Sequence, residues 1–398
     1  MAIYALINKD VLPFICTGKM VTKEFICSAT KLKKDSVYKW LDVTDPALPT
    51  IIQAKKLAKC LHVPFAGLYM NTKDINIKSI PAIRNYRTLD GAHSIDDSSL
   101  NIAIGDVLQE RDFLIAESND LGIHLIVFSA PSCPTDDPAD WAKKIREHFS
   151  IDIKDQYKCS SSRQFYLYLR ERLENKGIFV QCFTDVPVEI VRGFSIYEQD
   201  LPIIGINDND RPPAKSFSLI HELVHLIKRE SSVCNVMYNA TSSQSEEVFC
   251  NAVAGELLVP KDALAIVLHS GKYAKPYKVD DIAAIAKRFS VSREVIVRRL
   301  LDNGQISTME YETYSEEFHR EIKRDREEQR LARKAGLKTG IPKNVSREAI
   351  DRTSPAICKT LYYGYGEEIY SKRDIALHLG IAQKHVDKFL MEVSRWNS

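Results

Sequence analysis

The chain has 398 residues and an apolar fraction of 44%, which predicts two or three domains with real hydrophobic cores. Its 55 basic and 53 acidic residues leave a net charge of +2, which excludes any argument about partners from the charge of the whole chain. Nine scattered cysteines without a CxxC pair exclude a disulfide framework and predict reduced thiols.

The first residues, MAIYALINKDVLPF, show no basic segment followed by an apolar run of about 7–15 residues, so a signal peptide is not expected. No apolar stretch approaches the ~18 residues that a membrane helix requires. A soluble, cytoplasmic protein without a membrane partner is therefore expected.

Residues 1–77 are expected to be helical throughout. Apolar side chains recur at helical spacing in four short stretches: Asp10–Cys16, Val21–Ala29, Lys33–Leu41 and Thr50–Leu61. Pro49 precedes the last stretch, which suits a helix start. The segment holds 11 lysines against 6 acidic residues, a local excess of +5 that suits contact with a nucleic acid but does not require it.

The stretch from Val21 to Met70 resembles an XRE-type helix-turn-helix domain. Its second helix would be the recognition helix, whose first residues face the bases and phosphates of DNA. The side chains in that position are Lys33, Lys34, Ser36 and Lys39. Trp40 stands where such domains often carry a Trp-Glu pair, but Leu41 replaces the acid. The alternative is therefore a degenerate helix-turn-helix that docks a protein partner of the same fold.

The middle of the chain mixes helix and strand signals. The expected helices are Asn101–Leu121 and Ser161–Leu173. The expected strands are His124–Ala130, Ile178–Phe183, Gly193–Glu198 and Leu201–Asn207. Pro131–Asp140 is expected to be a loop, and Asn209–Pro213 a turn. These elements predict a small sheet among helices.

Residues 221–225 read His-Glu-Leu-Val-His. On a helix, His221 and His225 lie on the same face one turn apart, so both imidazoles can reach one metal ion. The surrounding residues are apolar almost all round, which predicts a buried helix with Ser216 or Ser218 as its N-cap. A buried carboxylate at Glu222 is costly unless it has a role, and taking a proton from a water on the metal is such a role. The alternative is a chance match to a short pattern.

A catalytic zinc ion needs a third protein ligand, and the next helical stretch offers one. The sequence Ser243–Glu246 has the form of a capping box, which gives Glu246 a structural task at the start of a helix. Glu247 then shares a helix face with Asn251, so we predict Glu247 as the third ligand and Asn251 as the partner of a metal-bound histidine. The alternative is a pair of carboxylates on one exposed helix turn. Two histidines and a glutamate favour zinc, with manganese and iron as the other metals considered.

The segments GFSIYEQDLPIIGINDNDRPPAKSFSLIHELVHLI and SEEVFCNAVAGELLVP resemble the ImmA/IrrE-type metallopeptidases, mainly over residues 160–270. The motif pair of that family is HExxH and ExxxN, and the second motif is intact although Cys250 replaces an alanine. The resemblance implies a gluzincin-like peptidase that uses zinc. Residue by residue, it maps the metal ligands onto His221, His225 and Glu247 and the general base onto Glu222.

The resemblance also implies a protein substrate, typically a helix-turn-helix repressor encoded nearby. The stretch Ile80–Thr88 resembles the linker of chains that fuse such a peptidase to an XRE domain. The resemblance does not supply a donor for the transition state in this chain. By residue type alone the candidates are Tyr197, Tyr238 and His269, and each could equally be an ordinary packed or surface residue.

The C-terminal part of the chain is expected to be mostly helical. Val279–Ser307 and Ser371–Leu390 also resemble helix-turn-helix units, and in the peptidase family the first is a structural or docking part as often as a DNA reader. The dense mixed charge of Ser315–Lys338 predicts a solvated helix face. A basic face is expected from Arg288, Arg293, Arg298 and Arg299.

Together these patterns predict an α+β protein with an N-terminal helix-turn-helix bundle, a gluzincin-like peptidase domain with a small sheet, and a helical C-terminal region. The expected domains are 1–77, 78–270 with its core at 160–270, and 271–398. The predicted function is zinc-dependent cleavage of a partner repressor or antitoxin, which would control transcription of a mobile element, a phage or a stress response. The alternative is a DNA-binding regulator or antitoxin with a non-catalytic metal site. The intact Glu222 argues against that alternative, because a structural site needs no general base.

Overall fold

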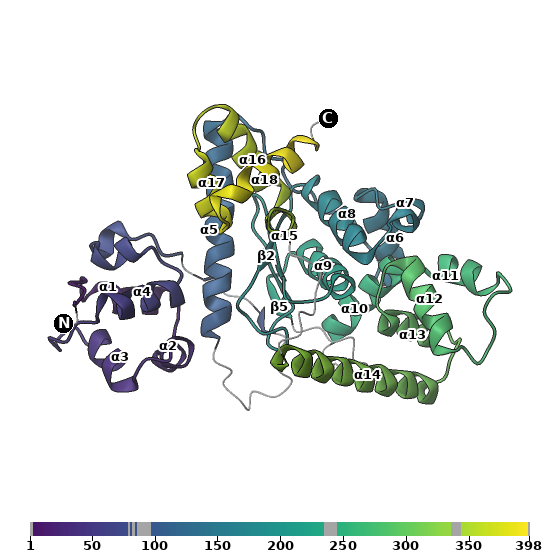
Figure 1. Cartoon of the computed structure of the whole chain (residues 1–398). Coiled ribbons are helices and arrows are strands. Elements are labelled where there is room, and N and C mark those ends of the chain that lie inside the picture. Colours follow the sequence, from purple (N-terminus) through teal and green to yellow (C-terminus); the bar gives the residue numbers. More distant parts are fainter. Residues whose placement is uncertain are drawn as a thin grey trace.

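The computed structural model describes residues 3–78, 80–81, 84–85, 97–234, 245–335 and 344–396. It shows a mostly helical protein with one small mixed sheet, which confirms the predicted α+β class (Figure 1). The first four helices lie on one side of the long helix α5 (Ser98–Asp120), the sheet lies on the other side, and the last helices of the chain lie against the upper part of α5 (Figure 1). Among the helices described, none combines the length and the apolar character needed to cross a bilayer.

Helices form at the four places predicted in the N-terminal segment. They are α1 (Val11–Gly18), α2 (Lys23–Thr30), α3 (Lys34–Leu41) and α4 (Ile51–Cys60), followed by the 3₁₀ turns η1 (Phe65–Tyr69) and η2 (Thr72–Asp74). The side chain of Thr22 caps α2, and Thr50 and Gln53 form a capping box at the start of α4. The helices enclose a core of their own that includes Trp40 and Leu61. That this bundle is a DNA-reading helix-turn-helix stays a prediction.

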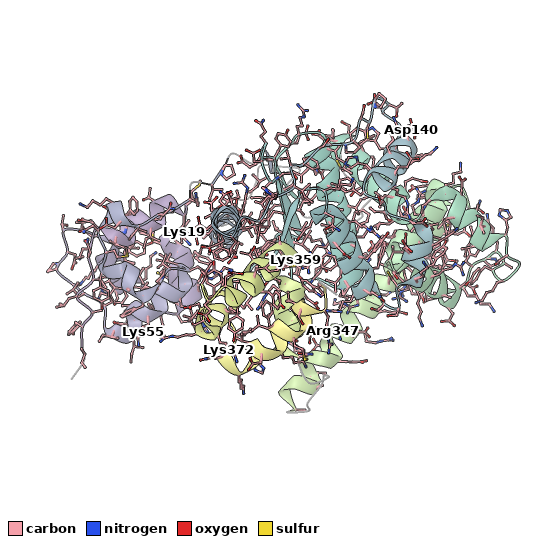
Figure 2. All side chains as sticks on the ribbon, turned by 90° about the horizontal axis from the view of Figure 1, so that it is seen from above. Lys19, Lys55, Asp140, Arg347, Lys359 and Lys372 are labelled. Carbon is pink, nitrogen blue, oxygen red and sulfur yellow. The ribbon has the colours of Figure 1, made fainter. Side chains whose placement is uncertain are left out.

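Polar contacts join this bundle to α5. The backbone N–H of Thr22 donates to Ser98 Oγ at 2.9 Å, at the first turn of α5. Two turns further along, Asp106 Oδ2 lies 2.6 Å from His62 Nδ1. Asp106 Oδ1 lies 3.6 Å from Nζ of Lys19, a buried lysine on the side of the bundle that faces α5 (Figure 2). The bundle is therefore anchored to α5 by paired charges as well as by packing.

Within the described residues, the sheet has five short strands in the order β1-β5-β3-β4-β2. They are β1 (Arg84–Asn85), β2 (Phe179–Phe183), β3 (Gly193–Ile196), β4 (Ile203–Asn207) and β5 (Ser232–Cys234). β2 runs parallel to β4 and β1 parallel to β5, whereas β3 is antiparallel to both β4 and β5. Strands are therefore present at three of the four predicted places.

The sheet is covered on both faces, and its side chains alternate between two cores. Val180 and Ile204 belong to the core that contains α8 (Ser162–Glu174) and α9 (Pro212–Ile227). Phe194 and Ile203 belong to the core on the opposite face, which contains α5 and the last helices of the chain. A Cβ at Gly205 would overlap the ring of Phe194, so a glycine is needed for this ring to lie against β4. Helix α9 thus packs directly on one face of the sheet.

The other helices fall into two groups. To the right of the sheet in Figure 1, around and beyond α9, lie α6 (Pro138–His148), α7 (Ile153–Lys158), α10 (Ser245–Leu258), α11 (Lys261–Leu268), α12 (Val279–Phe289) and α13 (Arg293–Asp302), and α14 (Thr308–Lys334) runs beneath them. Above the sheet lie α15 (Val345–Arg352), α16 (Pro355–Gly366), α17 (Lys372–Leu379), η3 (Gln383–His385) and α18 (Val386–Ser394). The long helix α14 contains most of the mixed-charge segment.

The predicted strand His124–Ala130 is wrong, because this segment is irregular and pairs with no described strand. This segment passes over the turn at Gly177, whose φ of 82° is in the left-handed region. The two backbones are so close that a Cβ on Gly177 would overlap the backbone of Ile126. The side chains of Ile126 and Val127 stay exposed. The apolar run therefore covers the turn before β2 instead of extending the sheet.

The predicted loop Pro131–Asp140 is too long at its C-terminal end. Helix α6 begins at Pro138, whose fixed φ suits the first helical position. The side chain of Asp137 accepts from the N–H of Ala139 and caps this helix. The polar segment predicted as a loop therefore contains the start of a helix.

Candidate metal centre

Helix α9 carries the HELVH segment and buries it completely. The helix begins at Pro212, which has no N–H to leave unpaired at the first position. The predicted N-cap at Ser216 or Ser218 is wrong, because both residues lie inside the helix, and Ser216 Oγ donates to the carbonyl of Pro212 at 3.2 Å. Every residue from Ser216 to Ile227 is buried. The side chains of the motif therefore point into the protein.

Three buried side chains from α9 and α10 meet at one point. Nε2 of His221 lies 3.2 Å from Nε2 of His225. The carboxylate of Glu247 spans both rings, with Oε2 at 3.4 Å from His221 Nε2 and Oε1 at 3.1 Å from His225 Nε2. Both histidines are fully buried, and Glu247 is 7% exposed. The structure thus brings together the three residues named as ligands from the sequence.

These spacings fit one metal ion. Four ligands in tetrahedral geometry with bonds of about 2.0–2.1 Å place neighbouring donor atoms about 3.3–3.4 Å apart. The two Nε2 atoms lie 3.2 Å apart, and each of them has one oxygen of the Glu247 carboxylate within 3.4 Å, at 3.4 Å for His221 and 3.1 Å for His225. Two imidazoles and a carboxylate also match the donor set of catalytic ions that keep a fourth position open. The side chains present therefore fit a single divalent ion.

The second nitrogen of each ring has its own neighbour. Asn251 Oδ1 lies 3.0 Å from His221 Nδ1, so this Nδ1–H donates to the amide and leaves Nε2 free to act as a ligand. Nδ1 of His225 faces Glu230 Oε2 at 3.6 Å and the Cys250 thiol at 3.9 Å. The end of α9 brings Glu230 there, since its backbone N–H donates to the carbonyl of His225 at 2.9 Å. Sequence reasoning named Asn251 and missed Glu230.

Glu222 is fully buried on the sheet side of α9. Its Oε2 accepts from Ser232 Oγ of β5 at 2.7 Å. Ser195 Oγ of β3 in turn lies 2.8 Å from Ser232 Oγ. No described group forms a hydrogen bond with its Oε1. Burial raises the pKa of Glu222, and the two histidines and the bond from Ser232 oppose that rise. The carboxylate is thus held on one oxygen only.

The neighbouring residues Glu246 and Glu247 have different surroundings. Glu246 Oε1 accepts from Lys228 Nζ at 2.7 Å, whereas Glu247 joins the cluster. Burial would raise the pKa of Glu247, but the hydrogen bonds and charges of His221 and His225 outweigh it and hold the pKa well below its ordinary value. Ser243 and Gln244 of the predicted capping box lie outside the described residues.

Residues 173–301 match the family model described as the IrrE N-terminal-like domain, a peptidase family. The match spans β2 to β5 together with α9 and α10, and therefore the whole cluster. It supports a metallopeptidase of the ImmA/IrrE type. It does not extend to the N-terminal bundle or to the helices after α13. No curated protein matches the chain.

The structure singles out none of the candidate donors for a transition state. The backbone N–H of Tyr197 donates to Ser231 Oγ at 2.9 Å, and its ring packs against the core. His269 is exposed, and its Nδ1 donates to the carbonyl of Ala265 in its own helix at 2.7 Å. Tyr238 lies outside the described residues.

The expected basic face of α12 and α13 is present only in part, because Arg288 is exposed whereas Arg299 is buried. Arg299 is only 5% exposed and also donates to the carbonyl of Val259 at 3.1 Å. The side chains in contact with the four arginines are Tyr157 for Arg288, Glu321 for Arg293, Asp302 for Arg298 and Glu256 for Arg299. Three of these contacts join α12 or α13 to neighbouring helices, and the Arg298–Asp302 pair lies within α13.

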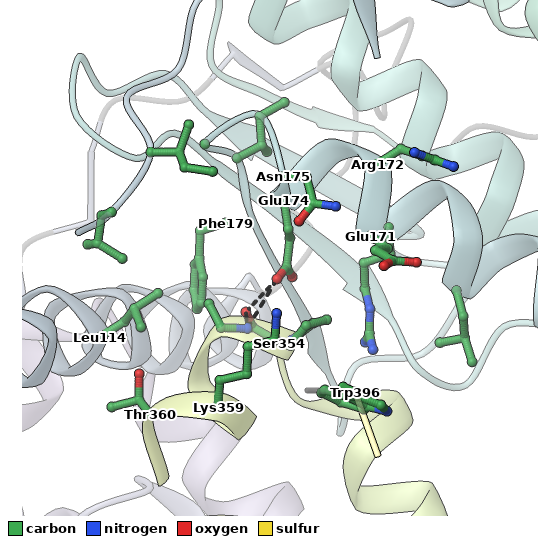
Figure 3. Close-up of a pocket in the computed structure, with 18 of the residues that line it drawn as sticks. Leu114, Glu171, Arg172, Glu174, Asn175, Phe179, Ser354, Lys359, Thr360 and Trp396 are labelled. Atoms are coloured by element: carbon green, nitrogen blue, oxygen red, sulfur yellow. Dashed lines mark hydrogen bonds between the residues drawn. The ribbon is translucent and has the colours of Figure 1, made fainter. Parts of the chain in front are cut away.

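A cavity of about 780 Å³ lies between α8 and the start of α16, and none of its lining residues belongs to the metal cluster (Figure 3). Glu174 in its wall caps α16, since Oε2 accepts from Ser354 Oγ at 3.1 Å and from the N–H of Ala356 at 3.3 Å (Figure 3). Burial raises the pKa of Glu174 to about 7, although Arg170 and these hydrogen bonds oppose the rise.

The substitution Glu174→Gln is expected to change the pH dependence of stability. Because the folded-state pKa of about 7 exceeds the ordinary value of 4.5, the folded protein binds more protons than the unfolded chain between these values. The free energy of unfolding of the wild type therefore falls as pH rises through this window. Glutamine does not titrate but still accepts from Ser354. The free energy of unfolding of the variant should therefore fall less than that of the wild type as pH rises through this window. Urea unfolding at about pH 5 and about pH 7.5 measures it, and an identical pH dependence in both proteins would contradict the assignment.

Proposed function

We propose that this protein is a zinc-dependent endopeptidase that regulates transcription by cutting a partner protein, either a helix-turn-helix repressor or an antitoxin. The observation that carries the proposal is the buried cluster of His221, His225 and Glu247 with the buried carboxylate of Glu222 on the same helix. The family match over residues 173–301 supports the peptidase class. A purely structural metal site would gain nothing from a buried carboxylate beside it.

In this proposal the three cluster residues hold the ion and Glu222 is the general base. A bound zinc ion lowers the pKa of a water to about 7 and polarises the carbonyl of the scissile peptide bond. Glu222 takes a proton from the attacking water as the oxygen of that water bonds to the carbonyl carbon. Glu222 then delivers the proton to the leaving nitrogen as the C–N bond breaks. The products are a new carboxylate and a new amine.

The choice of zinc rests on the donor set. Two imidazoles with one carboxylate suit zinc, whereas magnesium and calcium prefer oxygen ligands alone. Manganese and iron accept the same donors, so the metal content of the protein purified from its own host decides among the three. Zinc near one equivalent per chain is the expected result.

The proposal is tested with the helix-turn-helix protein encoded beside this gene. The full chain with zinc is incubated with that protein, and the fragments are identified by mass spectrometry. Cleavage at one bond is expected with the wild type, and none after chelation of the metal or in Glu222→Gln. No cleavage by the zinc-loaded wild type would rule out this neighbour as the partner, and cleavage by the variant at the wild-type rate would refute the mechanism.

Helix α3 supports a second contact of the same protein, with double-stranded DNA. Lys33, Lys34 and Lys39 are exposed on it, while Val37 and Trp40 face the core of the bundle. A helix that packs through one face and presents lysines on the other suits contact with phosphates. The competing arrangement is a bundle that docks a protein partner of the same fold.

The double variant Lys33→Ala/Lys34→Ala is expected to weaken binding to the protein's own promoter and to reduce the salt dependence of that binding. Each lost phosphate contact lowers the slope of log K against log salt by about 0.9. The matched control is Lys55→Ala/Lys56→Ala, which removes two exposed lysines from α4. Binding measured across salt concentrations tests this, and an unchanged slope in the first variant would favour protein docking instead.

A further inference from the structure

Two buried serines lie behind the carboxylate of Glu222, and the proposed reaction gives them no task. Ser232 Oγ donates to Glu222 Oε2 at 2.7 Å, and Ser195 Oγ lies 2.8 Å from Ser232 Oγ. Both serines are fully buried. The sheet register pairs Ser195 of β3 directly with Ser232 of β5, so backbone hydrogen bonds fix the separation of the two hydroxyls.

The hydrogens of the two hydroxyls determine which group donates in each of these hydrogen bonds. Each serine has one O–H to donate and an oxygen that accepts. Ser232 gives its hydrogen to Glu222, so its oxygen is left to accept from Ser195. The result is a chain in which Ser195 donates to Ser232 and Ser232 donates to Glu222. A donor bonded to a carboxylate forms one of the stronger hydrogen bonds in a protein.

The backbone below Glu222 restricts the carboxylate further. Gly193 lies two residues before Ser195 on the same face of β3. A Cβ at Gly193 would lie 3.2 Å from Glu222 Cγ and 3.3 Å from Oε1, so the side chain of Glu222 lies directly on the strand. Oε2 is occupied by Ser232, and no described group forms a hydrogen bond with Oε1. One oxygen is therefore held, and the other is left without a hydrogen bond to any described group.

We propose that Ser232 and Ser195 are positioning residues that fix the carboxylate of Glu222 so that Oε1 receives and returns the proton. This inference rests on the proposed function, because it assigns a task to the partners of its general base. In the step itself, an O–H bond of the attacking water breaks, its proton goes to Oε1, and the same proton then moves to the leaving nitrogen. Neither Ser232 nor Ser195 gains or loses a proton during the reaction.

Acetohydroxamic acid is a probe that needs no substrate. It binds a metal through its two oxygens and gives up its N–O–H proton, which a carboxylate fixed beside the metal accepts. The full-length protein is loaded with Co²⁺, whose visible absorption changes when the probe binds. Metal stoichiometry and thermal unfolding are measured on every variant, so that a change in binding is not confused with loss of the fold.

Ser232→Ala is expected to raise the Kd of the probe about tenfold, because one hydrogen bond to a carboxylate is lost. Ser195→Ala should raise it about two- to threefold, since Ser232 keeps its bond to Glu222. Ser232→Thr keeps the hydroxyl and should stay close to the wild type. The matched control is Ser216→Ala, another fully buried serine, whose hydroxyl bonds to its own helix; it should leave the Kd unchanged.

A wild-type Kd in Ser232→Ala at full Co²⁺ loading would overturn the positioning role. If that variant does not load with Co²⁺, Ser195→Ala decides, and an unchanged Kd there would likewise overturn the role. Glu222→Gln separates the two proposals, because an unchanged Kd in that variant contradicts the general base itself. With a cleavable partner, Ser232→Ala should lower kcat about tenfold at constant KM, and Ser232→Thr should restore it.

Discussion

Glu222→Gln is expected to lower kcat for cleavage of the partner by about 10²–10⁴-fold while the metal content of the protein stays the same. Glutamine has nearly the shape of glutamate, and its carbonyl oxygen still accepts from Ser232, so the packing of α9 should survive. What it lacks is the ability to take a proton from water. The rate of fragment appearance under single-turnover conditions measures the loss, and elemental analysis measures the metal.

Glu222→Asp provides the comparison for this substitution. It keeps a carboxylate but shortens the side chain, so the group moves away from Ser232 while it remains able to titrate. An intermediate rate is expected, between those of the wild type and Glu222→Gln. Wild-type rates in both variants would contradict the assignment of Glu222, and loss of metal in Glu222→Gln would mean that this carboxylate also holds the ion.

The part of the site that the sequence predicted depends on local geometry. Two histidines four residues apart share a helix face wherever the segment is helical, and the apolar residues around them predict burial of that helix. Glu247 and Asn251 are likewise related by one turn of α10. The cluster of His221, His225 and Glu247 then requires only that two helices pack together.

The part that the sequence did not predict depends on contacts between distant segments. Ser195 and Ser232 are separated by 37 residues and meet only because β3 pairs with β5 in one register. Nothing in either local sequence distinguishes them from ordinary strand serines. The glycine at 193 and the small serine at 195, at alternate positions of β3, were the one available signal that something packs closely on that face.

The wrongly predicted strand at His124–Ala130 also shows that a local pattern does not determine contacts between distant segments. Its apolar residues satisfied the strand pattern, but a strand also needs a partner edge. In the structure the segment meets the left-handed turn at Gly177, where no ladder of hydrogen bonds is available. Local pattern therefore predicted the helices of the site well and the sheet that supports Glu222 only in part.

Glu247→Gln is expected to weaken metal binding by more than about 100-fold, since losing a direct ligand should cost more than losing a residue that orients one. The matched control is the neighbouring Glu246→Gln, which removes the same charge one position earlier on α10. Glu246 pairs with Lys228 at 2.7 Å, and such a partly exposed ion pair contributes about 0–1 kcal/mol to stability. The control should therefore bind the metal like the wild type.

Competition with a chromophoric chelator measures the metal affinity of both variants, and thermal unfolding with and without zinc gives an independent measurement. A ligand that binds only the folded protein raises its stability in proportion to the logarithm of its concentration over Kd. Zinc should thus raise the Tm of the wild type and of Glu246→Gln but barely change that of Glu247→Gln. The reverse pattern would move the third ligand to Glu246. If both variants bind zinc as tightly as the wild type, neither carboxylate is a ligand. That result would refute the three-residue cluster as the metal centre.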